Sequence, residues 1–202
     1  MAQTILVRLN RYPDADIASV VLRPRVAGPL LGSFRVFQSS AVVFWFDAAG
    51  QLVCVDLVGY RQLLSSRLVA GDEYWPSPGL DRRADIMSEL RRRDADAQLE
   101  LMTTAPSPPA ASANPDAWIP PTAQLVGGMI DDLEVQRQPS DLEIALADGI
   151  DEAILGLDAA CGSCHTDYLV TPQTESGISV VIDNDGHLVA VEITRASNAL
   201  GT

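Results

Sequence analysis

Few side chains in this sequence can carry acid–base, nucleophilic or metal chemistry. The 202 residues include no lysine, so all 14 basic residues are arginines, and the only histidines are His165 and His187. Without lysine there is no Schiff-base chemistry, no phosphate-loop lysine and no lysine general base. The two histidines are the only side chains whose ordinary pKa lies near neutral pH. Candidate sites therefore depend on carboxylates, cysteines and these two imidazoles.

Two carboxylates stand at matching places in two similar segments. Asp56 follows DAAGQLVCV and Glu192 follows DNDGHLVAV, so each acid comes at the same point of a shared pattern. If both acids line one cavity, burial and mutual repulsion would raise the pKa of one of them and make it a proton donor. Asp56 and Glu192 are therefore candidate catalytic residues. The alternative is that each acid blocks association of its strand with another sheet.

Three further side chains near these acids could contact a ligand. Trp45 lies in an aromatic run and could stack on a bound molecule, Cys54 precedes Asp56 by two residues, and His187 follows the glycine of the second pattern. We predict Trp45, Cys54 and His187 as ligand-binding residues. For Trp45 the alternative is packing in the core.

The segment CGSCHTDY has the residue types and spacing of metal ligands. Cys161, Cys164 and His165, with Asp167 or Cys54 as a fourth ligand, would suit zinc, which prefers thiolate and imidazole. The Cys-x-x-Cys-His spacing also attaches haem, which requires export. A second Cys-x-x-Cys is absent, and three cysteines do not make a disulfide framework. The alternatives are a loop without a ligand and redox use of the cysteines. We expect no cofactor, with zinc as the alternative.

The elements that would position these residues form two similar series. Phe46–Leu57 and Ile182–Ile193 are identical at five of twelve aligned positions. Each segment predicts a β-hairpin, because an apolar strand leads into Asp-x-x-Gly and an alternating strand follows. Weaker similarity upstream extends each series to about five strands. We therefore expect an α+β protein of two repeated antiparallel β-meander units, which can pack together as an internal pseudo-dimer.

Alternation along the second strand of each hairpin predicts which face is buried. In the first hairpin Val53, Val55 and Leu57 share one face, which we expect to face the core. Asp56 then points to the opposite face, beside Leu52 and Cys54. That second face is only partly polar, so we expect a helix, a partner or a ligand to cover it.

Composition predicts where one unit ends and the next begins. We expect the first β-meander unit over 1–76 and a helix over 77–102, where Ser and Pro open a segment with apolar residues at helical spacing. Residues 103–122 are rich in Pro, Ala and Ser, which is typical of a semi-extended linker. Residues 123–202 are expected to hold a short helix and the second β-meander unit.

The hairpins and the segment RYPDADIASVVL resemble a family of short bacterial domains of unknown function. In the first half the matching residues are Tyr12, Asp16, Asp47, Gly50, Leu52, Val53, Val55 and Asp56, the last standing where the family has Glu. In the second half they are Asp183, Gly186, Leu188, Val189, Val191, Glu192 and Ile193, and the Tyr is missing. The resemblance implies a small α+β domain built on a curled antiparallel sheet, and it implies no activity.

Charge and composition narrow the classes of function. A net charge of −13 repels phosphate backbones and anionic membrane surfaces, so we expect neither nucleic acid nor a membrane as a partner. The sequence starts without the pattern of a signal peptide, so we expect a cytoplasmic location. We predict a cytoplasmic binding protein that holds a small apolar molecule or a protein partner between or beside its two units. The alternative is a small pocket enzyme that acts on a hydrophobic substrate, with a single acidic residue moving the proton.

Overall fold

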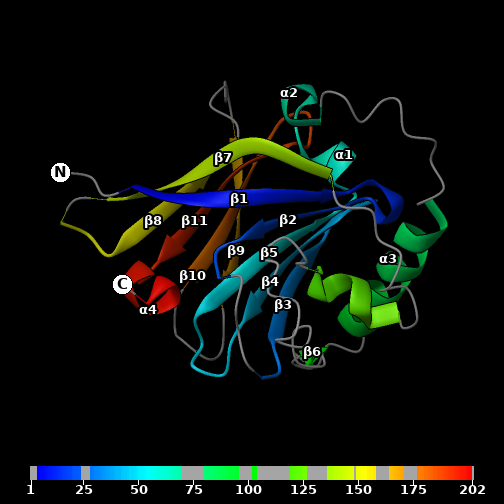
Figure 1. Cartoon of the computed structure of the whole chain (residues 1–202), viewed down its shortest axis with the longest axis horizontal. Helices are drawn as coiled ribbons and strands as arrows, with labels where there is room; N and C mark the ends of the chain where they lie inside the picture. The colour runs from blue at the N-terminus through cyan, green and yellow to red at the C-terminus, as the bar shows by residue number, and fades with distance from the viewer. Residues whose placement is uncertain are drawn as a thin grey trace.

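The architecture is one curled antiparallel sheet with short helices at its ends and a longer helix on its outside (Figure 1). The computed structural model describes residues 4–23, 28–69, 80–95, 102–103, 119–126, 136–147, 149–157, 164–170 and 177–201. Within these residues the sheet has 11 strands. The expected α+β class and the β-meander are confirmed.

The first half of the chain supplies one side of the sheet. Its strands are β1 (Thr4–Tyr12), β2 (Ile17–Val21), β3 (Leu31–Val36), β4 (Ala41–Phe46) and β5 (Leu52–Val58), and a two-residue strand, β6 (Met102–Thr103), pairs with β3. Outward from β1 the order is β2, β5, β4 and β3. A short 3-10 turn, η1 (Pro13–Ala15), joins β1 to β2, and the expected hairpin joins β4 to β5.

The second half supplies the other side. Its strands are β7 (Gln136–Leu146), β8 (Glu152–Gly156), β9 (Cys164–Val170), β10 (Gly177–Asp183) and β11 (Leu188–Thr194). Outward from β7 the order is β8, β11, β10 and β9. β1 and β7 pair antiparallel at the centre of the sheet, with Val7 opposite Leu142. The two halves thus meet along these two strands.

The helices lie at the ends and on the outside of the sheet. They are α1 (Tyr60–Leu63), α2 (Ser66–Val69), α3 (Leu80–Ala95), the 3-10 segment η3 (Pro121–Val126) and α4 (Ala196–Leu200). α3 lies within the helix expected over 77–102, whereas most of the expected linker over 103–122 lies outside the described residues. Among the described helices, none has the length and apolar character needed to cross a bilayer.

Two hydrophobic clusters pack against the sheet, one on its inner face and one on the outer face of the first half. The inner cluster combines side chains of both halves with those of α1 and α4, among them Leu9, Phe44, Leu57, Ile144, Leu155, Val180, Val191 and Ala199. The outer cluster lies between the outer face of the first half and α3 and η3, and includes Ile17, Val43, Trp45, Ile86, Met87, Leu90 and Ala123. The expectation that a helix covers the second face of β5 is therefore confirmed for this half.

The predicted alternation along β5 is wrong at Val53. Val53 belongs to the outer cluster, whereas Leu52 joins Val55 and Leu57 in the inner one. The register between β4 and β5 shifts between Trp45 and Phe46. Such a bulge inserts one extra residue, so the side chains on either side of it exchange faces. A simple period of two could not anticipate this local irregularity.

Candidate functional site

Asp56 is wholly buried on the outer face of β5, where η3 covers it. Its Oδ2 accepts hydrogen bonds from Trp45 Nε1 and from the Thr122 backbone N–H, both at 3.0 Å, and from the Thr122 hydroxyl at 2.6 Å. Its Oδ1 accepts one from the Ser19 hydroxyl. Four donors of this chain thus converge on one carboxylate and tie η3 to the sheet.

Burial dominates the electrostatics around Asp56. Desolvation raises the pKa of Asp56, although the hydrogen bonds from Ser19, Thr122 and Trp45 lower it. Burial also raises the pKa of Cys54 well above its usual range, and the negative charge of Asp56 adds to that increase. Cys54 is a free cysteine. Because the thiolate is the reactive form, a buried thiol with a raised pKa is a poor nucleophile.

Trp45, a predicted ligand contact, is wholly buried in the outer cluster. Its indole nitrogen donates to Asp56 and lies 3.0 Å from Thr122 Oγ1. The structure therefore brings three of the sequence-predicted residues together, since Trp45 and Cys54 are also directly opposite each other in the β4–β5 pair. It places them in a packed layer, which corresponds to the core-packing alternative for Trp45.

Glu192, the second candidate catalytic acid, is half-buried on the outer face of β11. It lies opposite Ile154 of β8 and Ser179 of β10. Asp56 has the matching position in the first half, opposite Ser19 of β2. The two acids thus occupy different halves, and no hydrogen bond or ion pair among the described side chains joins them. Proton transfer by either acid stays a prediction.

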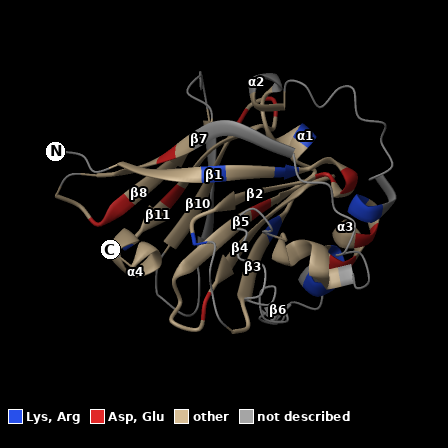
Figure 2. Ribbon diagram, viewed as in Figure 1, with Lys and Arg blue, Asp and Glu red and all other residues tan. Residues whose placement is uncertain are grey.

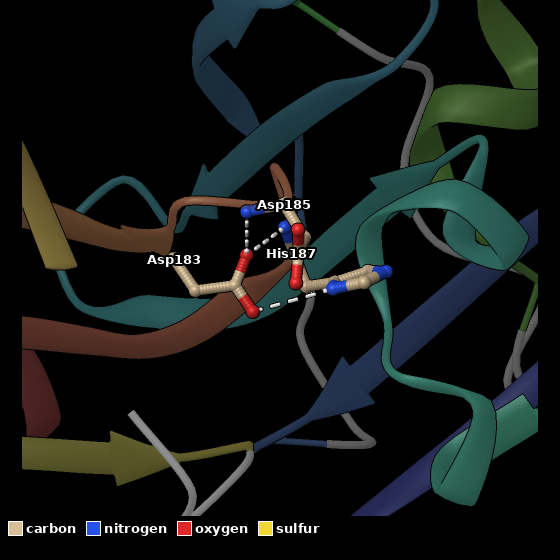
Figure 3. Close-up of side chains that lie close together, drawn as sticks. All are labelled: Asp183, Asp185 and His187. Carbon is tan, nitrogen blue, oxygen red and sulfur yellow. Dashed lines mark hydrogen bonds and ion pairs between the residues drawn. The ribbon is translucent and has the colours of Figure 1, made fainter. Parts of the chain in front are cut away.

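His187 lies in the β10–β11 hairpin turn with two aspartates (Figure 3). Asp183 Oδ1 accepts hydrogen bonds from the backbone N–H groups of Asp185 (2.9 Å) and His187 (2.8 Å), and its Oδ2 is 3.3 Å from His187 Nδ1. One ligand atom from each of the three residues lies within 4.8 Å of the others, so the turn offers two carboxylates and an imidazole to a cation.

The first hairpin explains Asp183 without a cation. There Asp47 Oδ1 accepts the same two hydrogen bonds, from the backbone N–H groups of Ala49 and Gln51, both at 2.9 Å. Partial burial raises the pKa of Asp183, but its bonds to the backbone and ring of His187 and to the backbone of Asp185 outweigh that effect and lower the pKa. The aspartate in each turn therefore acts first as a turn-forming residue.

The predicted metal segment lies at the start of β9 and is only partly described. Cys164 is exposed and disulfide-bonded, and Cys161 and the side chain of His165 lie outside the described residues. A disulfide sulfur is not a thiolate, so zinc binding here would require the reduced protein. The zinc site stays a prediction.

The outer face of the second half differs from that of the first because no described helix covers it. We call this surface, together with the adjoining Leu6 of β1, the open face; its residues are Leu6, Glu143, Ala145, Glu152, Ile154, Gly156 and Glu192. Directly opposite pairs place them side by side: Leu6 with Glu143, Glu143 with Gly156, Ala145 with Ile154, and Ile154 with Glu192. Figure 2 shows acidic residues on β7, β8 and β11.

Two large apolar side chains stand out on the open face. Leu6 is 65% exposed and Ile154 is 44% exposed, whereas the outer cluster of the first half is buried beneath α3 and η3. Sequence reasoning missed these two residues, because it treated the two halves as equivalent. The available signal was that the long helix expected over 77–102 can cover only one of the two outer faces.

The chain matches no protein-family model, no curated protein and no solved structure.

Proposed function

We propose that this chain is a binding protein made of two fused copies of one five-stranded unit, and that the open face of the second copy binds a protein partner. The proposal depends on one difference: helices cover the outer face of the first half, whereas no described helix covers the open face. The outer cluster of the first half is buried beneath α3 and η3, whereas Leu6 on β1 and Ile154 on β8 remain exposed on the open face. An exposed apolar surface rimmed by charged side chains is typical of an interaction site, and here Glu143 and Glu192 lie beside Leu6 and Ile154.

Equivalent hydrogen bonds in the two halves support a duplication. The Asp16 carbonyl oxygen accepts from the Tyr60 N–H at the start of α1 (3.4 Å), and the Asp151 carbonyl oxygen accepts from the Ala196 N–H at the start of α4 (3.1 Å). The carboxylates of the same two aspartates accept hydrogen bonds from the following backbone N–H. Arg61 N–H donates to Asp16 Oδ1 at 3.5 Å, and Ser197 N–H donates to Asp151 Oδ1 at 2.7 Å. A shared strand order and shared turns add to this support. The resemblance to short bacterial domains would apply to each unit.

Packing of the inner cluster favours a partner beside the sheet. Buried side chains of both halves occupy the space between them, including Phe44 and Leu57 from the first and Ile144 and Val191 from the second. A small apolar molecule between the halves would have to displace such side chains. A partner on the open face would displace none of the described side chains.

The enzyme alternative has one observation in its favour, the raised pKa of the buried Asp56. All four hydrogen bonds to this carboxylate come from the chain itself, however, and Thr122 covers it from the outside. Catalysis by Asp56 would require η3 to leave the sheet. Binding on the open face requires no such rearrangement.

Native mass spectrometry of the protein purified from its own host tests the proposed function. The wild type is compared with Ile154→Asp on the open face and with Ile150→Asp, a matched control in the β7–β8 turn where Ile150 is 59% exposed. We expect a stoichiometric partner chain with the wild type and with Ile150→Asp, and loss of that chain with Ile154→Asp. Equal partner content in both variants, or a bound small molecule in place of a chain, would contradict the proposal.

The cytoplasmic location is part of the same proposal, and the disulfide of Cys164 bears on it. Stable disulfides are typical of oxidising compartments. A reducing cytoplasm would open this disulfide, so thiol labelling in intact host cells tests the location, and we expect Cys164 to be labelled there. Resistance to labelling until a reductant is added would contradict a cytoplasmic location.

A further inference from the structure

We infer that the open face binds a basic amphipathic helix supplied by another chain; this inference rests on the binding function proposed above and names the chemistry of the partner. Three features of the molecule support it: the helix that covers the first outer face, the spacing of the apolar residues on the open face, and the charges that surround them.

The first outer face shows how a helix packs on this sheet. α3 lies across β3, β5 and η1 and buries Ile86, Met87 and Leu90 in the outer cluster. An arginine at the edge of that contact, Arg83, bonds Asp16 at 2.8 Å. This molecule thus already has one apolar helical stripe flanked by a guanidinium, which bonds an acid in the turn before β2.

The apolar residues of the open face fit a helix of the same kind. Leu6 lies on β1 and Ile154 on β8, with β7 between them. The side chains between them are small, since Ala145 is paired with Ile154 and Gly156 is paired with Glu143. Strand spacing and rise put the two apolar positions about 12 Å apart. Apolar residues two turns apart on a helix are about 11 Å apart, so one helical stripe can contact both.

The charges on the open face select a basic helix. Its acids are Glu143, Glu152 and Glu192, and among the described side chains the cation beside them is Arg8, on the same side of β1. The net charge of the whole chain is −13, which attracts a positively charged partner and repels a second copy of this chain. Lysine or arginine beside the apolar stripe of the partner would meet the glutamates, as Arg83 meets Asp16.

Two designed helical peptides test the inference on the full-length protein. Each has the length of α3, 16 residues, and the same apolar stripe. The polar positions carry Lys and Arg in one peptide and Glu in the other. Binding is measured by fluorescence anisotropy, at low and at high salt, for the wild type, Ile154→Asp, Glu192→Arg and the control Ile150→Asp, after circular dichroism has established that each variant is folded.

We expect the basic peptide to bind and the acidic one to fail. Ile154→Asp and Glu192→Arg should each weaken binding of the basic peptide by about tenfold or more, because a buried apolar contact or an opposed charge is worth that much at an interface. Ile150→Asp should change the affinity by less than about twofold. The affinity should fall as salt rises, because exposed charges are screened.

Equal affinity for the two peptides would overturn the inference. An affinity for the basic peptide that Ile154→Asp does not change would also overturn it. The outcome also separates it from the proposed function. If the native partner chain depends on Ile154 while neither peptide binds, the helical partner is wrong and the binding function stands. If no native partner depends on Ile154 and the basic peptide also fails, both are wrong.

Discussion

The indole nitrogen of Trp45 donates to the carboxylate of Asp56 at 3.0 Å, and both side chains are wholly buried. Thr122, which comes from η3 and lies 66 positions away in sequence, donates to the same oxygen through its backbone and its hydroxyl. Asp56, which the sequence predicts to be catalytic, and Trp45, which it predicts to contact a ligand, are thus hydrogen-bonded to each other. Their observed role is to fix η3 over the sheet.

Removing the Asp56 carboxylate should destabilise the fold strongly. Asp56→Ala removes the acceptor of the buried Ser19 and Thr122 donors and leaves the Trp45 indole with Thr122 Oγ1 alone, so we expect the free energy of unfolding to fall by about 3–5 kcal/mol. Thr122→Ala removes one hydroxyl donor and should cost about 1–2 kcal/mol. Urea unfolding followed by far-UV circular dichroism measures both. Glu192→Ala, on the half-buried equivalent, is the control, and an equal loss for Glu192→Ala would refute the account of Asp56.

The raised pKa of Asp56 makes its contribution to stability depend on pH. The folded state holds the proton more tightly than the unfolded chain, where the carboxyl has its ordinary pKa of 3.8. This contribution is therefore fully present below pH 3.8 and is lost as the pH rises through the folded pKa. The asparagine of Asp56→Asn does not titrate, so this variant does not lose that contribution. Its stability relative to the wild type should therefore increase from acid to neutral pH.

Unfolding curves of the wild type and Asp56→Asn, collected from acid to neutral pH, measure that difference. A difference that stays constant across this range would mean that Asp56 titrates alike in the folded and unfolded chains. A difference that moves in favour of the wild type at neutral pH would mean that the folded pKa is lowered rather than raised.

The turn glycines should show the cost of a left-handed backbone. Gly186 has φ of +87° and open space where a Cβ would stand, so Gly186→Ala tests backbone strain alone, and we expect a loss of about 1 kcal/mol. Gly156 also has open space around a Cβ, but its φ is not positive. Gly156→Ala should therefore be neutral or slightly stabilising. Thermal unfolding of both variants provides the comparison; similar losses at both positions would point away from turn strain.

Zinc binding at the start of β9 should depend on reduction. With Cys164 in its disulfide, the protein lacks a thiolate at that position, and we expect no stoichiometric zinc. Elemental analysis of protein loaded with zinc, with and without a reductant, decides the matter. One zinc per chain without a reductant would contradict this expectation, and retention of zinc by Cys164→Ser after reduction would exclude Cys164 as a ligand.

Local signals predicted more of this fold than of its site. The hairpins at Asp47 and Asp183 were predictable because turn chemistry is contained within a few residues. The bulge near Val53 and the partners of Asp56 were not, since Thr122 is brought to the sheet only by tertiary packing. Asp56 is the only acid within the apolar run LVCVDLV, and this isolation indicates burial. The prediction of alternating faces did not use that signal.

A photo-crosslinking amino acid at position 154, introduced in the native host, tests the binding role of the open face most directly, with position 150 as the matched control. The account predicts an adduct between position 154 and another chain, at residues of a basic helix, and no such adduct from position 150. Adducts of equal yield from both positions, or crosslinks from position 154 that stay within the same chain, would contradict it.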